Sequence, residues 1–201
     1  MDRQRDLPSI LERGGIHCDR EIAELGLAGQ GIAHSHIKAR RARRAVPVGR
    51  GGTLADYVPF YFAPRSPMLY ALHRGAVEGY TGGQRPIFHL AGNAEEAVAG
   101  GLACAFTDGH ADMGFTEFYE DLRDLDKIDW AVMGDRYWRD TVDDPDRSRR
   151  RQAEFLIHRF FPWNLVHTIG VIDRTIADEV RAILADPAHR PEVSAKPEWY
   201  Y

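Results

Sequence analysis

Alternating and continuous hydrophobic runs predict several strands along the chain. Residues 85–90 (RPIFHL) and 165–173 (LVHTIGVID) are rich in β-branched and aromatic side chains, and 103–106 forms a shorter run of the same kind. Residues 57–62 (YVPFYF) also favour extended backbone, but Pro59 has no amide hydrogen to donate to a ladder. The last segment is therefore predicted to be an edge strand or an irregular one.

Hydrophobic spacing and punctuation residues predict helices between these strands. Asp6 followed by LPSILER and two glycines is typical of a short helix over 7–13 with an N-cap and a glycine stop. Residues 38–44 (KARRARR) predict a surface helix or an ordered loop. Apolar positions at helical spacing predict further helices over 115–125 and 176–184. Because helices and strands alternate without a regular βαβ rhythm, the pattern favours an α+β fold.

Length and composition predict one cytoplasmic domain spanning residues 1–201. Hydrophobic residues make up 44% and charged residues 28%, which is typical of a globular protein rather than a disordered chain. Neither a run of about 18 apolar residues nor a signal peptide is visible. The two cysteines, Cys18 and Cys104, are too few for a disulfide framework and suit apolar packing in a reducing compartment.

The formal net charge of -4 argues against a nucleic-acid partner. This total, however, hides an uneven distribution of charge along the chain. Residues 25–55 contain no Asp or Glu, yet they carry six Lys or Arg residues and two histidines. Residues 117–146 are strongly acidic, and a basic cluster follows at 147–151. Such blocks are either solvated faces or, for the first of them, a surface that attracts a polyanion.

Common catalytic signatures are absent from the sequence. It has no P-loop, no dinucleotide-binding glycine motif, no H-E-x-x-H, no paired C-x-x-C and no G-x-S-x-G. The close histidine pairs lack a third ligand at a diagnostic spacing, so we expect no metal site.

Three segments remain unusual, and each has a structural and a functional interpretation. Residues 57–70 (YVPFYFAPRSPMLY) form either a rigid core-facing turn or, with Arg65, an aromatic platform for a base or a nicotinamide ring. Glu154 precedes an apolar run and is either a solvated strand end or a carboxylate that stabilises an oxocarbenium ion. In 106–115 a turn predicted at Thr107, Asp108 and Gly109 presents His110, which is either a loop residue without a role or part of a site.

Together these segments resemble the DarT family, the DNA ADP-ribosyltransferase toxins of bacterial toxin–antitoxin pairs. The resemblance covers nearly the whole chain, through DLPSILERGGI, HIKARRARRAVP, DYVPFYFAPRSPMLY, YTGGQRPIFHL, FTDGH, QAEFL and KPEWYY. It implies a compact single-domain fold related to poly(ADP-ribose) polymerases. It also implies transfer of ADP-ribose from NAD to N3 of thymine in single-stranded DNA, without a metal, and a macrodomain antitoxin of the DarG kind as a partner.

The resemblance also implies a role for individual residues. Glu154 matches the catalytic glutamate that contacts the nicotinamide ribose, and Arg41 matches the catalytic arginine near the pyrophosphate. His110 opens the long loop that presents the acceptor base. The remaining matches are Ser9 and Ile16 on the NAD side and Tyr61, Arg65 and Met68 on the DNA side.

One part of the family pattern is missing from this sequence. Family members begin with a strand that carries a His-x-Thr motif and holds part of NAD. Here MDRQR stands ahead of the first helix, with no histidine and no apolar run, which predicts that this strand is absent. Two alternatives to the transferase therefore stay open: an impaired single-stranded-DNA-binding remnant, and an NAD glycohydrolase or a transferase with another acceptor.

Overall fold

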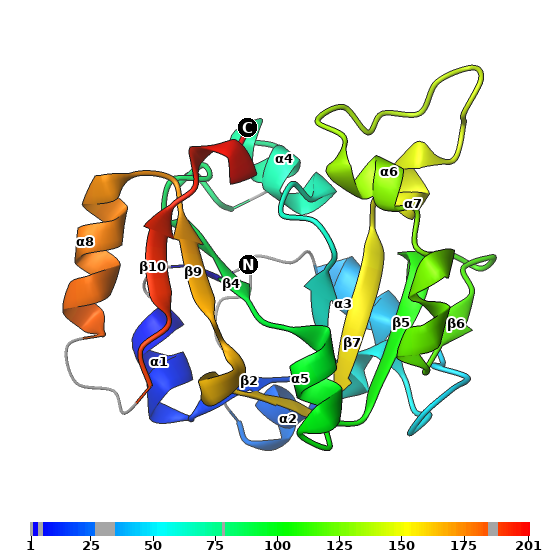
Figure 1. Ribbon diagram of the computed structural model, residues 1–201, viewed down its shortest axis with the longest axis horizontal. Helices are drawn as coiled ribbons and strands as arrows, with labels where there is room; N and C mark the ends of the chain where they lie inside the picture. Colours follow the sequence, from blue (N-terminus) through cyan, green and yellow to red (C-terminus); the bar gives the residue numbers. More distant parts are fainter. Residues whose placement is uncertain (1, 4–5, 27–34, 78, 185–188) are drawn as a thin grey trace. The chain divides into compact units, whose positions relative to one another are not determined.

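Segments distant in the sequence build each of two structural units. The computed structural model describes residues 2–3, 6–26, 35–77, 79–184 and 189–201 (Figure 1). The first unit combines 1–16, 67–97 and 161–201, and the second combines 17–66 and 98–160. A single domain over 1–201 stays a prediction. The α+β class is confirmed, because helices are interspersed with mainly antiparallel strands in both units.

The first unit is organised around a sheet with strand order β1-β4-β9-β10. Only the β9–β10 pair is parallel. Its elements are β1 (Asp2–Arg3), α1 (Leu7–Glu12), α4 (Pro67–His73), β4 (Ile87–Ala91), β9 (Thr168–Val171), α8 (Arg174–Ile183) and β10 (Glu192–Ala195), with short 3-10 helices at Trp163–Leu165 and Pro197–Trp199. Three elements include residues on both sides of a unit boundary: β2 (Gly15–His17), β8 (Phe160–Pro162) and α5 (Ala94–Ala99).

The chain end packs on the sheet of the first unit. The Tyr200 hydroxyl donates to the carbonyl oxygens of Ile87 (2.7 Å) and Gly170 (3.1 Å). The Trp199 ring lies so close to Gly170 that a Cβ there would overlap it. A glycine in β9 is therefore required for this packing.

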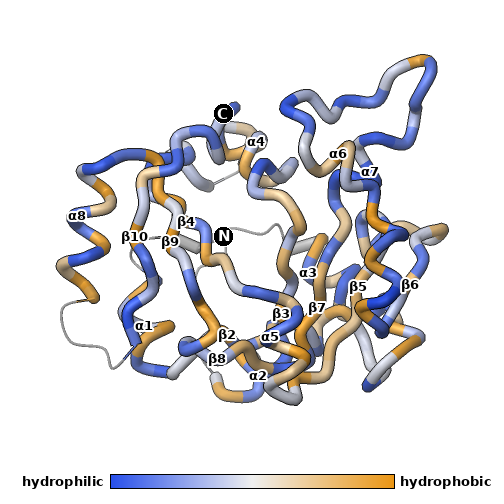
Figure 2. Tube along the Cα trace, viewed as in Figure 1, coloured by the Kyte–Doolittle hydropathy of each residue, from blue (hydrophilic) through white to orange (hydrophobic). Residues whose placement is uncertain are grey.

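The second unit is built on an antiparallel sheet with strand order β3-β7-β5-β6. Its elements are α2 (Asp19–Glu24), α3 (Ser35–Arg41), β3 (Tyr57–Tyr61), β5 (Cys104–His110), β6 (Phe118–Tyr119), α6 (Trp130–Gly134), α7 (Arg147–Arg150) and β7 (Ala153–His158), with 3-10 helices at Leu54–Asp56 and Leu122–Lys127. The central strands β5 and β7 are mainly buried, and their apolar residues appear as the hydrophobic stretch of this unit in Figure 2.

Both faces of β7 are packed. On one face Leu156 joins a buried cluster with Val46, Leu54, Tyr57, Ala105 and Ala111. On the other, Phe155 lies near Phe106, with ring centroids 6.5 Å apart, and near the edge of Phe62 at 6.1 Å. A strand buried on both faces can accommodate a charged side chain only if that charge is paired.

Most predicted elements are confirmed, with shifted ends. The strand over 57–62 is an edge strand, as Pro59 required, and the helices at α1 and α8 form where expected. The N-cap prediction was wrong in its detail, because the Asp6 side chain makes no capping bond. Helix α3 spans Ser35–Arg41, so it begins three residues before the predicted segment 38–44 and ends inside it.

Two predictions were wrong. Residues 115–125 do not form one helix: Phe118 pairs with Thr107 in a ladder, and Asp121 then caps a separate 3-10 helix. The predicted turn at 107–109 is a bulged part of β5.

A two-residue strand, β1, precedes the first helix, and its Arg3 pairs with Ile87. This strand carries no His-x-Thr motif, so the absence of the family's motif-bearing strand stays a prediction.

Both cysteines are free thiols, with Cys18 buried and Cys104 half-buried. In the described ranges, no helix has the length and apolar character needed to cross a membrane.

Candidate active site

Glu154 is the second residue of β7 and one of the most buried charged residues of the second unit, with 1% of its surface exposed. It lies in a run of five buried positions from Ala153 to Ile157. Moving a carboxylate into such an environment costs several kcal/mol unless a counter-charge accompanies it. The interpretation of Glu154 as a solvated strand end is therefore wrong.

The counter-charge is the guanidinium of Arg41, the last residue of α3. Its Nη1 donates to Oε2 of Glu154 at 2.9 Å and to Oε1 at 3.2 Å. The backbone amide of Ala111 also donates to Oε1, at 3.2 Å. Burial lowers the pKa of Arg41, but the Glu154 carboxylate outweighs burial and leaves this pKa above its usual range. Arg41 is therefore a permanent cation.

Arg41 retains donor capacity toward a ligand. Its Nη2 is buried and makes no hydrogen bond within the described residues. A buried guanidinium nitrogen without a partner is unfavourable by about 1–3 kcal/mol, so a phosphate or carbonyl oxygen placed there would be stabilising. The residues present thus fit an anionic ligand beside Glu154.

A β-bulge aligns the carboxylate. Phe106 pairs with Phe155 and His110 with Ala153, so four steps along β5 match two along β7. Inside this bulge the Thr107 hydroxyl accepts the Glu154 amide hydrogen at 3.0 Å and donates to the Gly109 carbonyl at 2.7 Å. The bulge directs the Ala111 amide at the carboxylate, as bulges beside functional sites commonly do.

Tyr61 lies directly opposite Glu154 in the β3–β7 ladder, so both side chains share one face of the sheet. Although 37% of the residue's surface is exposed, its phenol oxygen is buried. Burial of its phenol and the nearby Glu154 carboxylate raise the pKa of Tyr61 well above its usual range. It is a neutral hydrogen-bonding and stacking group at neutral pH.

His110 ends β5 next to Ala111 and is half-buried. Its Nδ1 accepts the Asp112 amide hydrogen at 3.3 Å, which places the proton of the neutral ring on Nε2. Burial lowers the pKa of His110, and Arg41 lowers it further, against the opposing effect of Glu154. The ring is therefore neutral at pH 7.

We expect His110 to weaken the fold in acid. Because its folded pKa is below the unfolded value of about 6.5, its contribution to stability is present above that pH and is lost as the pH falls through the folded pKa. The free energy of unfolding, measured with urea between pH 8 and pH 5 at intervals of about one unit, should fall less in His110→Gln than in wild type. His158, whose pKa is also lowered by burial, is present in both proteins and therefore contributes the same pH dependence to each. Equal losses in both proteins would contradict this assignment.

Arg151 connects the site to the segment after β3. It is 3% exposed, and its Nε donates to the Arg65 carbonyl at 3.3 Å. Its Nη1 donates to the carbonyls of Val132 (2.8 Å) and Met133 at the end of α6. Because Arg151 stands three residues before Glu154, it fixes the Arg65 backbone and α6 to the start of β7.

Replacing Arg151 should lower stability strongly. Arg151→Met keeps the buried stem but leaves three carbonyl oxygens without this donor, so the free energy of unfolding should fall by about 3 kcal/mol. Urea unfolding followed by circular dichroism measures it. The control is Arg123→Met, which removes an exposed arginine paired with Asp121 and should leave the free energy of unfolding nearly unchanged, because water screens an exposed pair. A similar loss in both variants would contradict the role of Arg151.

The second unit contains five of the predicted site residues: Glu154, Arg41, His110, Tyr61 and Arg65. The other three belong to the first unit. Ser9 lies in α1, Ile16 in β2 and Met68 in α4, and all three are half-buried. Their assignment to NAD and DNA stays a prediction.

Sequence reasoning missed the residues that hold Glu154 in place. The amide of Ala111 has no signature in a sequence, since every residue except proline carries one. Thr107 was named as a turn residue, whereas its hydroxyl forms part of the bulge. Arg151 was noted as one of a basic cluster, and its burial has no sequence signal. Within the parts of the chain that are described, no group of three His, Cys, Asp or Glu side chains is suited to a metal ion.

Comparison with known families and structures agrees with this geometry. The family described as "ssDNA thymidine ADP-ribosyltransferase, DarT" matches residues 2–201. A DNA ADP-ribosyl transferase of Thermus aquaticus is 42% identical over 198 residues, which cover 98% of this chain and 85% of that protein. A fusion of a DNA ADP-ribosyl transferase and a DNA ADP-ribosyl glycohydrolase from Thermosipho africanus is 26% identical over 179 residues, covering 88% of this chain and 42% of the fusion.

Two solved structures of DarT from Thermus sp. 2.9 match the whole of this chain. The complex with ADP-ribosylated single-stranded DNA has a TM-score of 0.93 and 39% identity, with 93% of that chain covered. The complex with NAD+ has a TM-score of 0.87 and 37% identity, with 94% covered. The fold and the site therefore define an ADP-ribosyltransferase. The chain belongs to the DarT family, and it is a DNA ADP-ribosyltransferase of that type.

Proposed function

We propose that this protein transfers ADP-ribose from NAD to N3 of thymine in single-stranded DNA and releases nicotinamide. The observation that carries the proposal is the buried pair of Glu154 and Arg41, in which Nη2 of the guanidinium has no hydrogen-bond partner among the described residues. An anion beside a cation suits a substrate that develops positive charge next to a diphosphate. The DNA and NAD+ complexes of the Thermus sp. 2.9 protein support this choice of substrates.

Glu154 acts on the ribose in this proposal. When the bond between C1′ and the nicotinamide nitrogen breaks, nicotinamide leaves as a neutral molecule with the bonding electrons, and positive charge remains on the ribose. The buried carboxylate accepts hydrogen bonds from the ribose hydroxyls and stabilises that charge in a site of low dielectric constant. Here both carboxylate oxygens bond to Arg41, so Arg41 must release at least one of them first.

The diphosphate provides a reason for that release. Its charge competes with Glu154 for the guanidinium, and Nη2 is the group that can bond to it without breaking an existing contact. Arg41 stands at the end of α3, whose last turn also carries Lys38 and Arg40. Lys38 and Arg40 already pair with Asp19 and Asp112, so Arg41 is the cation of this turn that meets the diphosphate.

Thymine N3 is a poor nucleophile while it is protonated, so the acceptor step needs stabilisation of its anion. N3 forms the new bond to C1′, and its proton passes to the solvent. Arg41 cannot accept this proton, because its raised pKa keeps it charged at every relevant pH. It acts as a cation that stabilises the N3 anion, while Tyr61, Arg65, Met68 and His110 contact the acceptor strand.

We also propose that the protein is the toxin of a toxin–antitoxin pair in the cytoplasm, with a macrodomain antitoxin that removes the modification. The fused glycohydrolase of the Thermosipho africanus relative supports a partner that reverses the reaction.

Labelled NAD and a thymidine-containing oligonucleotide test the proposed reaction. We expect label on the oligonucleotide and none on an oligonucleotide without thymidine. Nicotinamide release without transfer would instead indicate a glycohydrolase. Retention of DNA with neither product would indicate a binding remnant. Expression in bacteria should inhibit growth, and co-expression of a macrodomain glycohydrolase should relieve it.

A further inference from the structure

The end of β5 continues into a turn over residues 110–116 that is closed by its own hydrogen bonds. The His110 carbonyl accepts the Met113 amide at 3.0 Å and the Thr116 hydroxyl at 2.8 Å. The Thr116 amide donates in turn to the Met113 carbonyl at 3.2 Å. This turn carries the Ala111 amide, which donates to the buried carboxylate of β7. The position of the turn therefore sets one of the contacts that orient this carboxylate.

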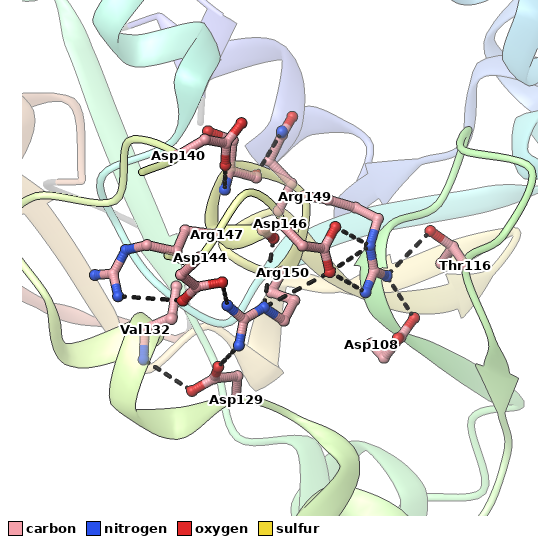
Figure 3. A network of polar contacts seen from close by, with 12 residues as sticks. Asp108, Thr116, Asp129, Val132, Asp140, Asp144, Asp146, Arg147, Arg149 and Arg150 are labelled. Carbon is pink, nitrogen blue, oxygen red and sulfur yellow. Dashed lines mark hydrogen bonds and ion pairs between the residues drawn. The ribbon is translucent and has the colours of Figure 1, made fainter. Parts of the chain in front are cut away.

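Arg149 of α7 holds the turn and the bulge before it (Figure 3). Its guanidinium donates to Asp108 at 3.0 Å and to the Thr116 hydroxyl at 3.5 Å, and it also pairs with Asp146 at 2.8 Å. The side chain is 12% exposed and lies so close to Gly109 that a Cβ there would overlap it. The bulged end of β5 is thus fixed to α7.

Arg44, which follows the end of α3 by three residues, holds the backbone of the same turn. Nε of Arg44 donates to the Ala111 carbonyl at 3.3 Å, and Nη2 donates to the Met113 carbonyl at 3.0 Å. The guanidinium lies 5.6 Å from the Phe118 ring, which packs against the buried cluster of this unit. Ala111 is therefore held at both ends, because its amide contacts Glu154 and its carbonyl contacts Arg44.

Arg40 makes a charged contact with this turn. Its Nε lies 2.6 Å from Oδ2 of Asp112, whose side chain is 6% exposed. Arg40 and Arg44 thus both bond to the turn, whereas Arg41 between them bonds to the carboxylate of β7. Neighbouring arginines of one segment consequently hold the carboxylate and the backbone beside it.

Release of Arg41 leaves the Glu154 carboxylate dependent on the turn. Once the guanidinium turns toward the diphosphate, the Ala111 amide at 3.2 Å is the remaining donor to this carboxylate among the described residues. It bonds to Oε1 and so leaves Oε2 to accept hydrogen bonds from the ribose. Glu154 then keeps its orientation only as well as the turn keeps this amide in place.

We propose that Arg44 is a positioning residue for cleavage of the bond between C1′ and nicotinamide: by holding the turn, it keeps the Ala111 amide directed at Glu154. Its planar guanidinium suits this task, because two of its nitrogens reach two carbonyls at once. The inference rests on the proposed function for the cleavage of NAD, and it adds a residue that acts through another.

The kinetics of an Arg44 variant test this role. Arg44→Met keeps the unbranched stem and removes both donors, so kcat for nicotinamide release should fall about tenfold to a hundredfold, while KM for NAD stays within about twofold. Arg44→Lys keeps the charge and one donor group, and should recover part of the rate. The matched control is Arg43→Met, because Arg43 is exposed and its Nε donates to the Ala39 carbonyl in α3 at 3.2 Å. We expect the control to change kcat less than about twofold, and an unchanged kcat in Arg44→Met would overturn the inference.

A double variant separates positioning of Glu154 from a merely structural role. If Arg44 acts through Glu154, Arg44→Met should lower the residual nicotinamide release of Glu154→Gln no further, because the charge that it positions is already absent. A structural defect would lower the rate by the same factor in both backgrounds. An additional tenfold loss in the Glu154→Gln protein would therefore contradict the proposal.

Hydrogen exchange at the Ala111 amide tests the inference without the reaction. Measured by NMR on isotope-labelled protein, exchange at this amide should rise about tenfold in Arg44→Met, the scale of one hydrogen bond, and stay unchanged in Arg43→Met. The Glu154 amide, which bonds to Thr107, serves as the reference within the same protein and should exchange as in wild type. Unchanged exchange at Ala111 would overturn the inference even in a fully active transferase. A selective increase at Ala111 would support it even if no label reached DNA.

Discussion

Replacing Glu154 with glutamine should lower ADP-ribose transfer by about 10²–10³-fold while the oligonucleotide still binds. Glutamine has nearly the same shape, but it has no charge to stabilise the positive ribose. Nicotinamide release should fall by the same factor, because both products pass through the same broken bond. Single-turnover transfer with labelled NAD, with anisotropy on the same protein, measures the two effects separately.

The control for this prediction is Glu24→Gln. Glu24 also pairs with an arginine, Arg159 at 2.8 Å, but its side chain is 54% exposed and it ends α2 rather than lying in the buried strand β7. We expect less than a twofold change from it, about the scale of a surface pair. If Glu154→Gln retained a tenth or more of the transfer rate, the carboxylate could not hold the proposed role. In bacteria, growth inhibition should disappear with Glu154→Gln and persist with Glu24→Gln.

Arg41→Met should lower the transfer rate about a hundredfold and also weaken the fold. The substitution removes the cation for the diphosphate and for the thymine anion. It also leaves Glu154 buried with the Ala111 amide, at 3.2 Å, as the remaining donor to its carboxylate among the described residues, so the free energy of unfolding should fall by about 3 kcal/mol. Urea unfolding at pH 7 measures the fold, and transfer at saturating NAD measures the chemistry.

A double variant separates these two effects. Arg41→Met combined with Glu154→Gln removes both charges, so it should recover part of the stability lost in Arg41→Met and none of the activity. Arg41→Lys should keep the charge but lose the planar donor group, and should therefore give an intermediate rate. An Arg41→Met protein with full DNA modification, or with unchanged unfolding, would contradict the assignment.

The clustering of charge along the sequence was a useful but incomplete guide. The basic segment 25–55 contains Arg41, and part of the acidic stretch 117–146 pairs with the arginines that follow it, through Asp129, Asp135, Asp144 and Asp146. The net charge of -4 therefore says little about the charge that a ligand meets. Local sequence patterns were informative for α8 and for the edge strand β3, because residues within each of these elements are enough to predict its conformation.

Periodicity was misleading where partners distant in the sequence decide the structure. Phe115, Phe118, Leu122 and Leu125 have helical spacing, yet Phe118 pairs with Thr107 and lies beside the bulge of β5. The bulge itself inserts two residues opposite β7, and nothing in FTDGH distinguishes it from a turn. Ladder bonds to another strand outweighed the weak intrinsic preference of the segment.

The sequence by itself determined the fold class, restricted the proline-containing strand to an edge or irregular position and, through its resemblance to the DarT family, identified Glu154 and Arg41 as candidates. Only the tertiary structure decided that these two residues, 113 positions apart, form one buried pair, and that Ala111 and Thr107 hold the carboxylate. The physical reason is that burial and long-range pairing depend on how strands associate. A carboxylate at a strand start is solvated or catalytic according to neighbours that local sequence does not contain.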